Sequence, residues 1–469
     1  MNLHRPVAAL LLLACAMAED AAAPANQPAA QPQPAAQANQ QPAPAPAAAP
    51  PAQVQQPAAA GLSIDQAIIL ALARNETPEI AMARIERAEA ALERARSALL
   101  PSVTLGGSLA TNDQDAIPHG GDANETARWS ATAQMALLRA SAWSNLSAAR
   151  YGLRAQQLES MELKRILAFT VGNVFLNVLA AERQVIAAEN RLQVSQSSVA
   201  DAKARLQAGL ATRTDVTRAE LEEATAKLSV TRTRNLVTTT RLALSDLIVS
   251  PLPEALAIPT AIDVPSRDGE VLGRLALSYR PDLRALQFRE AAADQYVRAA
   301  YGRWIPDVSA NAVASEFDTN DPATAPVDKT TDVTLSLSAS WTLYDGGDRG
   351  GAIAEAQASR RETGLNRTQQ LRGLRKELLT ALADLETAEA ALQQAEARER
   401  LARANAEEVH ARYKQGLATA LEDADAISSQ FEAESDQVSA RLAMARARLT
   451  LRQLTGMWPV SDREPTATP

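Results

Sequence analysis

The carboxylates that could act together in this chain follow a short motif that occurs twice. Gly-Leu-Ala-Thr stands at 209–212 and again at 416–419, an offset of 416 − 209 = 207 residues. After the second copy come Glu422 and Asp425, and their spacing of three places both carboxylates on one face of a helix, where they repel each other. The chemistry that such a pair offers is electrostatic, because it favours cations near the turn.

Helix capping accounts for only some of the acids near these turns. Both copies match a capping box, Thr-x-x-Asp in the first and Thr-x-x-Glu in the second, which explains Asp215 and Glu422 without any further role. Asp425 has no such explanation. Its equivalent in the first half (425 − 207 = 218) is Arg218, so the two halves differ in charge at this point.

No other pattern in the chain offers catalytic chemistry. His4, His119, His410 and Cys15 lie too far apart in sequence for metal-ligand spacing. A Walker-type glycine loop and a Gly-x-Ser-x-Gly elbow are both missing from the sequence. The net charge is −8 with no basic face, which argues against nucleic acid. The sequence therefore predicts a protein that is not an enzyme and that takes any energy for work from a partner.

Long helices must position the two turns. The composition is 46% apolar but only 3% aromatic, which favours long packed helices over an aromatic core. Helical patterns run from about 146 to 208 and from about 350 to 415, and return helices follow at 213–249 and 420–458. In the second pattern leucines recur with coiled-coil spacing: Leu371, Leu378, Leu385 and Leu392. Each motif is thus predicted to be the tip of a helical hairpin.

Each half also carries one predicted β-hairpin, preceded by a helix that covers 63–98 in the first half. The strands are expected at 102–111, 129–138, 307–317 and 331–343. The last strand alternates without a break, with Ser and Thr on one face and on the other Val333, Leu335, Leu337, Ala339, Trp341 and Leu343. This pattern fits either a half-buried strand of a soluble sheet or a strand of a membrane barrel. The barrel is favoured because no segment is left over to cover the apolar face.

Four strands from one chain cannot close a barrel, and open sheet edges are not tolerated in lipid. Two chains would give eight strands and a barrel filled by its own side chains, whereas three chains would give twelve strands and room for a lumen. The small Ser/Thr face suits a water-filled interior. The sequence therefore predicts a mainly α fold with two structural repeats, assembled as a homotrimer around a 12-stranded membrane β-barrel.

Residues 1–18 are predicted to be a secretory signal. Arg5 precedes an apolar run, Val7 to Ala14, that is too short to span a bilayer. The only cysteine, Cys15, follows Leu-Leu-Ala, which resembles the lipobox of bacterial lipoproteins. Cleavage before Cys15 would leave an acylated N-terminus, while cleavage after Ala18 also fits an A-x-A site.

The rest of the chain divides into four segments. Residues 19–60 are almost wholly Ala, Pro and Gln, a composition that predicts a semi-extended linker. Repeat 1 is expected at 61–265, repeat 2 at 266–460 and a flexible tail at 461–469.

The order helix, hairpin, long helix, Gly-Leu-Ala-Thr turn and helix, completed twice after a signal, resembles the TolC-like outer-membrane efflux proteins. The resemblance covers residues 62 to about 458 and depends on these stretches in combination: LSIDQAIILALARN, LLPSVTL, GLATRTDV, WTLYDGGDRG and RYKQGLATALEDADA. With a lipid on Cys15, the chain is most similar to the lipoprotein branch of RND-type tripartite systems. No cofactor beyond that covalent lipid is expected.

The resemblance implies a location and a set of partners. The expected protein is a lipid-anchored exit channel of the bacterial outer membrane, with an α-helical barrel that extends into the periplasm. A periplasmic adaptor (membrane fusion protein) would dock on it and open it, and an inner-membrane transporter of RND or ABC type would supply energy. Multidrug resistance is one role of such channels, and the cargo is not readable from the sequence.

The resemblance also implies roles for residues at the turns. Glu422 and Asp425 match acids that narrow the periplasmic entrance, and Asp215 matches a residue that locks the closed state. Some members have a basic partner for that lock where this chain has Ala418, so the lock is absent here or rebuilt around Arg213. The adaptor contact is expected at the two tips: Gly209, Leu210, Ala211, Thr212, Gly416, Leu417, Ala418 and Thr419.

One alternative stays open besides an enzyme on a helical scaffold. A periplasmic adaptor lipoprotein also carries a coiled-coil hairpin and a lipid, but it should have one hairpin flanked by β-rich domains. Two hairpins and alternating strands favour the channel.

Overall fold

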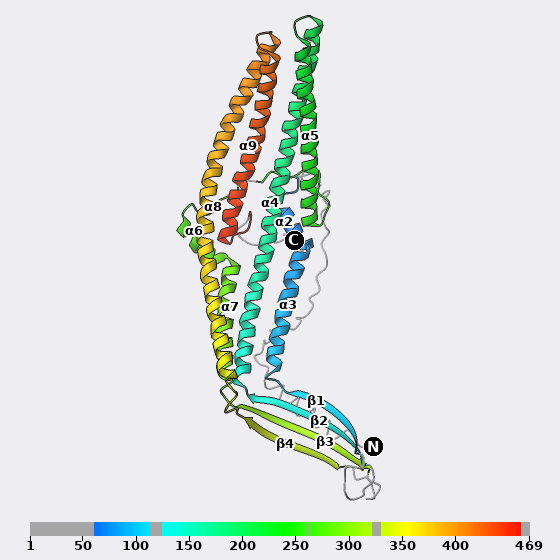
Figure 1. Ribbon diagram of the computed structural model, residues 1–469, viewed down its shortest axis with the longest axis vertical. Coiled ribbons are helices and arrows are strands. Elements are labelled where there is room, and N and C mark those ends of the chain that lie inside the picture. The colour runs from blue at the N-terminus through cyan, green and yellow to red at the C-terminus, as the bar shows by residue number, and fades with distance from the viewer. Residues whose placement is uncertain (1–60, 113–123, 260–261, 321–329, 461–469) are drawn as a thin grey trace, which may run out of the picture. The chain divides into compact units, whose positions relative to one another are not determined.

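The computed structural model describes residues 61–112, 124–259, 262–320 and 330–460 (Figure 1). The predicted signal, Cys15, the linker and the tail lie outside the described residues. The described chain forms two compact units. One unit holds Ala90–Arg150 and Ala292–Arg360, and the other holds the remaining described residues.

The first unit is built on one antiparallel sheet in the order β1-β2-β3-β4 (Figure 1). The hairpins of the two repeats join through β2 and β3, while β1 and β4 form the two edges. The strands are Ser102–Asn112 (β1), Asn124–Leu138 (β2), Asp307–Asn320 (β3) and Thr330–Ser340 (β4). All four predicted strands are confirmed.

Cross-strand pairing gives the sheet one apolar and one polar face, as the alternation predicted. Leu335 lies opposite Ala312 on β3, and the same row continues to Ala133 and Val103. The next row is polar and contains Ser336, Asn311, Gln134 and Ser102. The leucines of the apolar face are exposed, Leu335 to 72%. A surface of this kind is typical of strands that face lipid.

The strand predicted to reach Leu343 ends at Ser340, which corrects the sequence-based boundary. The indole N–H of Trp341 donates to the carbonyl of Trp304 at 3.2 Å, and the guanidinium of Arg349 lies over the Trp304 ring and donates to the Leu343 carbonyl at 3.3 Å. These contacts turn the chain out of the sheet. Trp304, Trp341 and Tyr344 remain exposed here, as in the aromatic girdles of membrane barrels.

Two helical hairpins follow the same plan, 207 residues apart. Their return helices match end for end, since 213 + 207 = 420 and 248 + 207 = 455. The hairpins are Ala140–Gln207 (α4) with Arg213–Ile248 (α5), and Asp348–Lys414 (α8) with Ala420–Thr455 (α9). The duplication and both tips are confirmed, with α4 beginning six residues before the predicted 146.

The helix expected at 63–98 is two helices, which corrects the prediction. Asn75 is extended, and its Oδ1 accepts from the Thr77 N–H at 2.9 Å, so it ends one helix and caps the next. In the second repeat Arg280 is extended because it precedes Pro281, the first residue of the next helix. The four helices are Ile64–Arg74 (α2), Glu76–Ser97 (α3), Gly269–Tyr279 (α6) and Pro281–Gly302 (α7).

The core of the helical unit lies where these short helices meet the long ones. One apolar cluster includes Ile68 of α2, Phe175 of α4 and Leu244 of α5. Its counterpart in the second repeat includes Leu272 of α6 and Leu378 of α8, one of the heptad leucines. Among the described helices, α4 alone contains a stretch apolar enough to cross a membrane, and half of that stretch is buried inside the protein.

Candidate functional site

The two tips have the same backbone geometry. Gly209 and Gly416 have φ of +71° and +78°, a left-handed conformation that side chains other than glycine rarely adopt. At the first tip the N–H of Leu210 donates to the Arg205 carbonyl at 2.8 Å and the Gly209 N–H to Leu206 at 3.1 Å, and the second tip repeats both bonds. This is a Schellman motif, so glycine is required by the backbone and not by crowding.

An exposed leucine follows each glycine. In a Schellman motif the apolar residue at this position usually packs back on the helix. Leu210 and Leu417 are instead 78% and 73% exposed. The tips thus present two apolar side chains that nothing in the described chain covers.

Both predicted capping boxes are present. The Thr212 N–H donates to Asp215 at 2.8 Å and the Thr419 N–H to Glu422 at 2.7 Å, and each threonine hydroxyl accepts from the N–H of its acid. The pKa of Asp215 and the pKa of Glu422 lie below their ordinary values. The hydrogen bond from the threonine backbone N–H is the main cause in each case, and the hydrogen bond from the threonine hydroxyl is the next. Both acids therefore carry charge as well as capping the helix.

The other residues predicted to act at the entrance, Asp425, Arg213 and Ala418, take no part in these capping bonds. Asp425 is exposed, and its carboxylate forms no hydrogen bond or ion pair in the described part of the chain. No ion pair joins Asp215 to Arg213 within the described ranges, and the cation whose charge acts on Asp215 is Arg218. Ala418 is half-buried at its tip.

Contacts that were not predicted from the sequence join one hairpin to the other near the tips. Arg205 of α4 donates to the Tyr413 carbonyl of α8, and its guanidinium lies 4.3 Å from the Tyr413 ring centroid. Asp423 of α9 contacts His410 of α8 at 3.0 Å and Ser198 of α4 at 3.3 Å. The signal in the sequence was an acid at 423 where the first repeat has Val216, but its partners are set only by packing.

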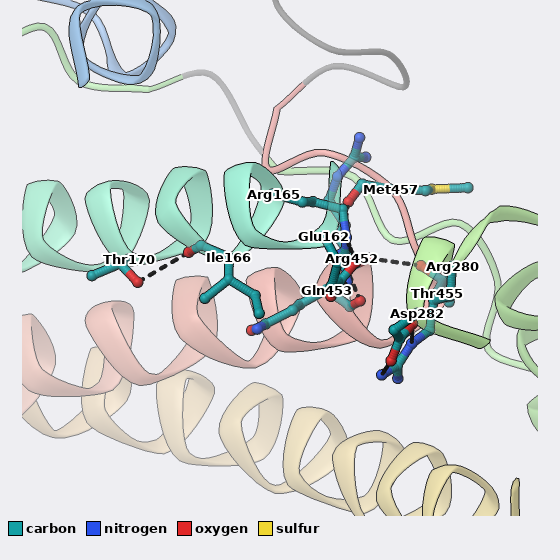
Figure 2. Close-up of polar contacts among 10 residues, drawn as sticks. All are labelled: Glu162, Arg165, Ile166, Thr170, Arg280, Asp282, Arg452, Gln453, Thr455 and Met457. Carbon is teal, nitrogen blue, oxygen red and sulfur yellow. Dashed lines mark hydrogen bonds and ion pairs between the residues drawn. The ribbon is translucent and has the colours of Figure 1, made fainter. Parts of the chain in front are cut away.

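A buried polar cluster lies at the other end of α9 (Figure 2). Arg165 of α4 is 2% exposed; it binds both oxygens of Glu162 and donates to the Gln453 carbonyl at 2.8 Å and the Met457 carbonyl at 3.2 Å. It thereby satisfies carbonyls at the C-terminus of α9, where Gly456 has φ +85°. A Cβ atom at position 456 would lie 2.6 Å from the backbone nitrogen of Arg280. Only glycine therefore lets the end of α9 pack against the α6–α7 break.

Charges around this cluster are paired with one another. Arg280 binds Asp282 at 3.0 and 2.7 Å, and Arg289 binds Glu159 at 2.6 Å. Burial alone would raise the pKa of Asp282, but the hydrogen bonds from Arg280 outweigh it and the pKa lies below its ordinary value. The described residues contain no group of three or more His, Cys, Asp or Glu that could hold a metal ion. The cluster holds helices together, and its acids are paired with arginines and do not offer an acid and a base for catalysis.

Comparison with known proteins decides between the channel and the adaptor. A family model described as outer membrane efflux protein matches residues 67–248 and 272–457, one segment in each repeat. The chain belongs to the outer membrane efflux protein family. It is thus a non-enzymatic transport protein, the outer-membrane efflux channel of tripartite efflux or export systems, with a periplasmic extension.

Relatives and solved structures agree with this efflux protein assignment. The chain is 26% identical over 433 residues to the pyoverdine export outer membrane protein OpmQ of Pseudomonas putida, covering 87% of this chain and 89% of OpmQ. Its fold is similar to that of CusC (TM-score 0.75, 17% identity, 84% and 92% coverage). The open state of the MtrE outer membrane channel of Neisseria gonorrhoeae is similar too (TM-score 0.73, 20% identity, 85% and 90% coverage).

Proposed function

We propose that three copies of this chain close a 12-stranded barrel and form a passive exit duct, opened at its periplasmic end by an adaptor. The observation that carries the trimer is the four-stranded sheet, whose edges β1 and β4 have no partner strand in the described part of one chain. Open edges are not tolerated in lipid, and twelve strands leave room for a lumen lined by the Ser/Thr face. An inner-membrane transporter supplies the energy, since the sequence has no Walker-type glycine loop that would bind a nucleotide.

The entrance is narrowed by acids at the tip of the second hairpin. Asp425 is exposed and free of described partners, and Glu422 stays charged because its cap lowers its pKa. Three-fold symmetry turns these two acids into six, a constriction that favours cations. Asp215 of the first hairpin adds negative charge at the same end, and the closed state is held without a basic residue at 418.

Single-channel conductance in a planar bilayer tests the duct and its constriction. The wild type should pass a small, cation-selective current. Glu422→Ala/Asp425→Ala should raise the conductance and lose the selectivity, because the ring of charge is gone. The matched control is Glu86→Ala/Glu89→Ala, which removes two exposed acids of the same spacing from α3.

Each outcome of this measurement has a distinct meaning. A correctly folded wild type that does not conduct would contradict the duct itself. A conducting wild type that the Glu422/Asp425 variant leaves unchanged would leave Glu422 as a helix cap and Asp425 as an exposed surface acid. Equal effects of the test and control pairs would point to overall charge and not to a constriction.

The tips are the proposed contact for a periplasmic adaptor. Leu210 and Leu417 are the exposed apolar side chains, and Gly209, Ala211, Thr212, Gly416, Ala418 and Thr419 complete the two surfaces. A partner hairpin that covers both leucines would gain roughly 1.5–3 kcal/mol from each.

Removal of these leucines should therefore uncouple the channel. In a strain lacking the gene, Leu210→Ser/Leu417→Ser should restore less than about a tenth of the resistance to an exported toxic compound that the wild type restores. The reason is that each leucine is worth about tenfold or more in affinity for the adaptor. Its conductance in isolation should stay normal. Leu242→Ser, which removes an exposed leucine near the other end of α5, is the control. Normal resistance with the double variant would show that the adaptor binds elsewhere.

Cys15 is the proposed site of a covalent lipid that anchors the mature chain to the outer membrane. The support is the lipobox-like Leu-Leu-Ala before the only cysteine. The mass of the mature N-terminal peptide decides between an acylated Cys15 and cleavage after Ala18.

A further inference from the structure

Two arginines at the membrane end of the helices have no role in the fold or in the proposed channel. They are Arg150 of α4 and Arg298 of α7, and both are exposed. Neither side chain forms a hydrogen bond or an ion pair within the described ranges of the chain. Nearby Arg303, by contrast, is paired with Asp348. The two exposed guanidinium groups are therefore available to a ligand from outside the chain.

The turn of α4 shows which way Arg150 points. A recess at the end of the sheet contains Asp307 and Ser340, a pair that belongs to the polar face. Ser141 and Asn145 of α4 line the same recess, so this side of α4 faces the lumen. At about 100° per residue, Arg150 lies roughly 180° from Ser141 around the helix. Arg150 therefore points to the outside of the tube.

The same reasoning places Arg298 on the outside of α7. The alanines at 299–300 line the recess, and Arg298 and Tyr301 flank this pair on the other side of the helix. Here α7 packs closely on α4, because a Cβ atom at Gly302 would lie 2.8 Å from the backbone nitrogen of Ser141. The two arginines thus belong to one outward surface.

Exposed aromatic side chains mark the depth of this surface in the membrane. Trp143 is 57% exposed and Tyr301 is 51% exposed. Each lies on the outward side of its helix, closer to the sheet than the arginine on that helix. Aromatic rings of this kind sit at the level of the lipid headgroups. Arg298 is about one helical turn from Tyr301, and Arg150 about two turns from Trp143, so both can reach headgroup phosphates on their flexible stems.

The charge at this end of the protein is opposite in sign to that of the whole chain. The segments of the first unit that adjoin the sheet contain eight arginines and five acids, a net charge of +3. They are 90–101, 139–150, 292–306 and 341–360. The full chain carries −8. A basic belt on an otherwise acidic protein fits an anionic lipid surface.

We propose that Arg150 and Arg298 bind the phosphate of an anionic phospholipid in the periplasmic leaflet of the outer membrane. The inference rests on the proposed barrel, since the barrel sets the depth of the two side chains. Arginine suits this ligand because its planar guanidinium donates two parallel hydrogen bonds to a phosphate. A phosphatidylethanolamine headgroup is a weaker ligand, because its ammonium group brings a positive charge close to the arginines.

Native mass spectrometry of the purified full-length protein, titrated with phosphatidylglycerol or phosphatidylethanolamine, tests this site. The wild type should bind phosphatidylglycerol more tightly, and the preference should fall at high salt, because salt screens exposed charges. Arg298→Gln should weaken phosphatidylglycerol binding roughly fivefold, the effect of one basic residue at an anionic surface. Arg150→Gln/Arg298→Gln should bring the two lipids close to equal affinity.

The matched control is Lys164→Gln/Arg284→Gln. Each residue lies 14 positions farther from the membrane than its counterpart (164 − 150 = 298 − 284 = 14), on the same face of α4 or α7 and about 21 Å away. Arg284 is exposed and Lys164 is half-buried. This variant loses the same two charges and should keep the wild-type preference. An unchanged helical circular dichroism signal shows that each variant is folded.

The outcomes separate this lipid site from the proposed channel. Equal affinity of the wild type for the two lipids, or a full preference in Arg150→Gln/Arg298→Gln, would overturn the site. An equal loss of preference in the control variant would point to overall charge and overturn it as well. A spectrum that contains only single chains would contradict the proposed trimer, while the lipid preference of each chain would still decide the site.

Discussion

Leu335→Arg is expected to abolish assembly in the outer membrane, whereas Ser336→Arg next to it should assemble. Leu335 lies mid-strand in β4, in a row with Val103, Ala133 and Ala312. An arginine on the lipid side of a barrel costs about 2–4 kcal/mol at the midplane, and a trimer repeats that cost in each chain. Ser336 belongs to the polar row, where a charge can meet water.

Heat-resistant trimers in the outer-membrane fraction give the readout for this pair of variants. The two changes add the same side chain to neighbouring positions of one strand, so differences in expression or in strand propensity largely cancel. Insertion of Leu335→Arg at the level of Ser336→Arg would mean that the apolar row does not face lipid. Failure of both would point to a packed interior in place of a water-filled lumen.

Arg165→Met is expected to lower the free energy of unfolding by about 3–5 kcal/mol. The substitution leaves Glu162 as a buried carboxylate without its cation and removes the donors to the Gln453 and Met457 carbonyls (Figure 2). A buried charge that loses its partner is among the most costly single changes in a protein. The effect should therefore be about as large as that of truncating a large core side chain.

Urea titration of the helical circular dichroism signal, with the full-length protein in detergent, measures this loss. Arg289→Met breaks the more exposed pair with Glu159 and should cost about 1 kcal/mol or less. Glu162→Leu/Arg165→Met should recover much of the stability, because no isolated charge remains. Equal urea midpoints for Arg165→Met and Arg289→Met would show that the buried ion pair contributes no more to stability than the exposed one.

Much of the fold could be predicted because the signals are local. The turn at 209–210, with its left-handed glycine and exposed leucine, depends on neighbours within a few residues, and so do the threonine caps of α5 and α9. The alternation in β4 depends only on the geometry of one strand. The duplication was visible as a constant offset between the two tips.

Boundaries failed where a distant residue decides them. The strand after Val333 stops at Ser340 because Trp341 donates to Trp304, 37 residues earlier in the chain. The first helix breaks at Asn75, whose side-chain nitrogen donates to the Leu247 carbonyl at 3.2 Å. Neither partner can be identified from the pattern around the break.

By itself the sequence determined the repeats, the hairpin tips, the capped acids and the two faces of the sheet, since each is set by periodicity or by a cap. Tertiary structure alone decided that β2 pairs with β3, that Arg165 is buried at the end of α9, and that Asp423 meets His410 and Ser198. These features join residues up to 292 positions apart, as in the Arg165–Met457 contact. Such partners are chosen by the packing of whole helices and strands, which no local pattern encodes.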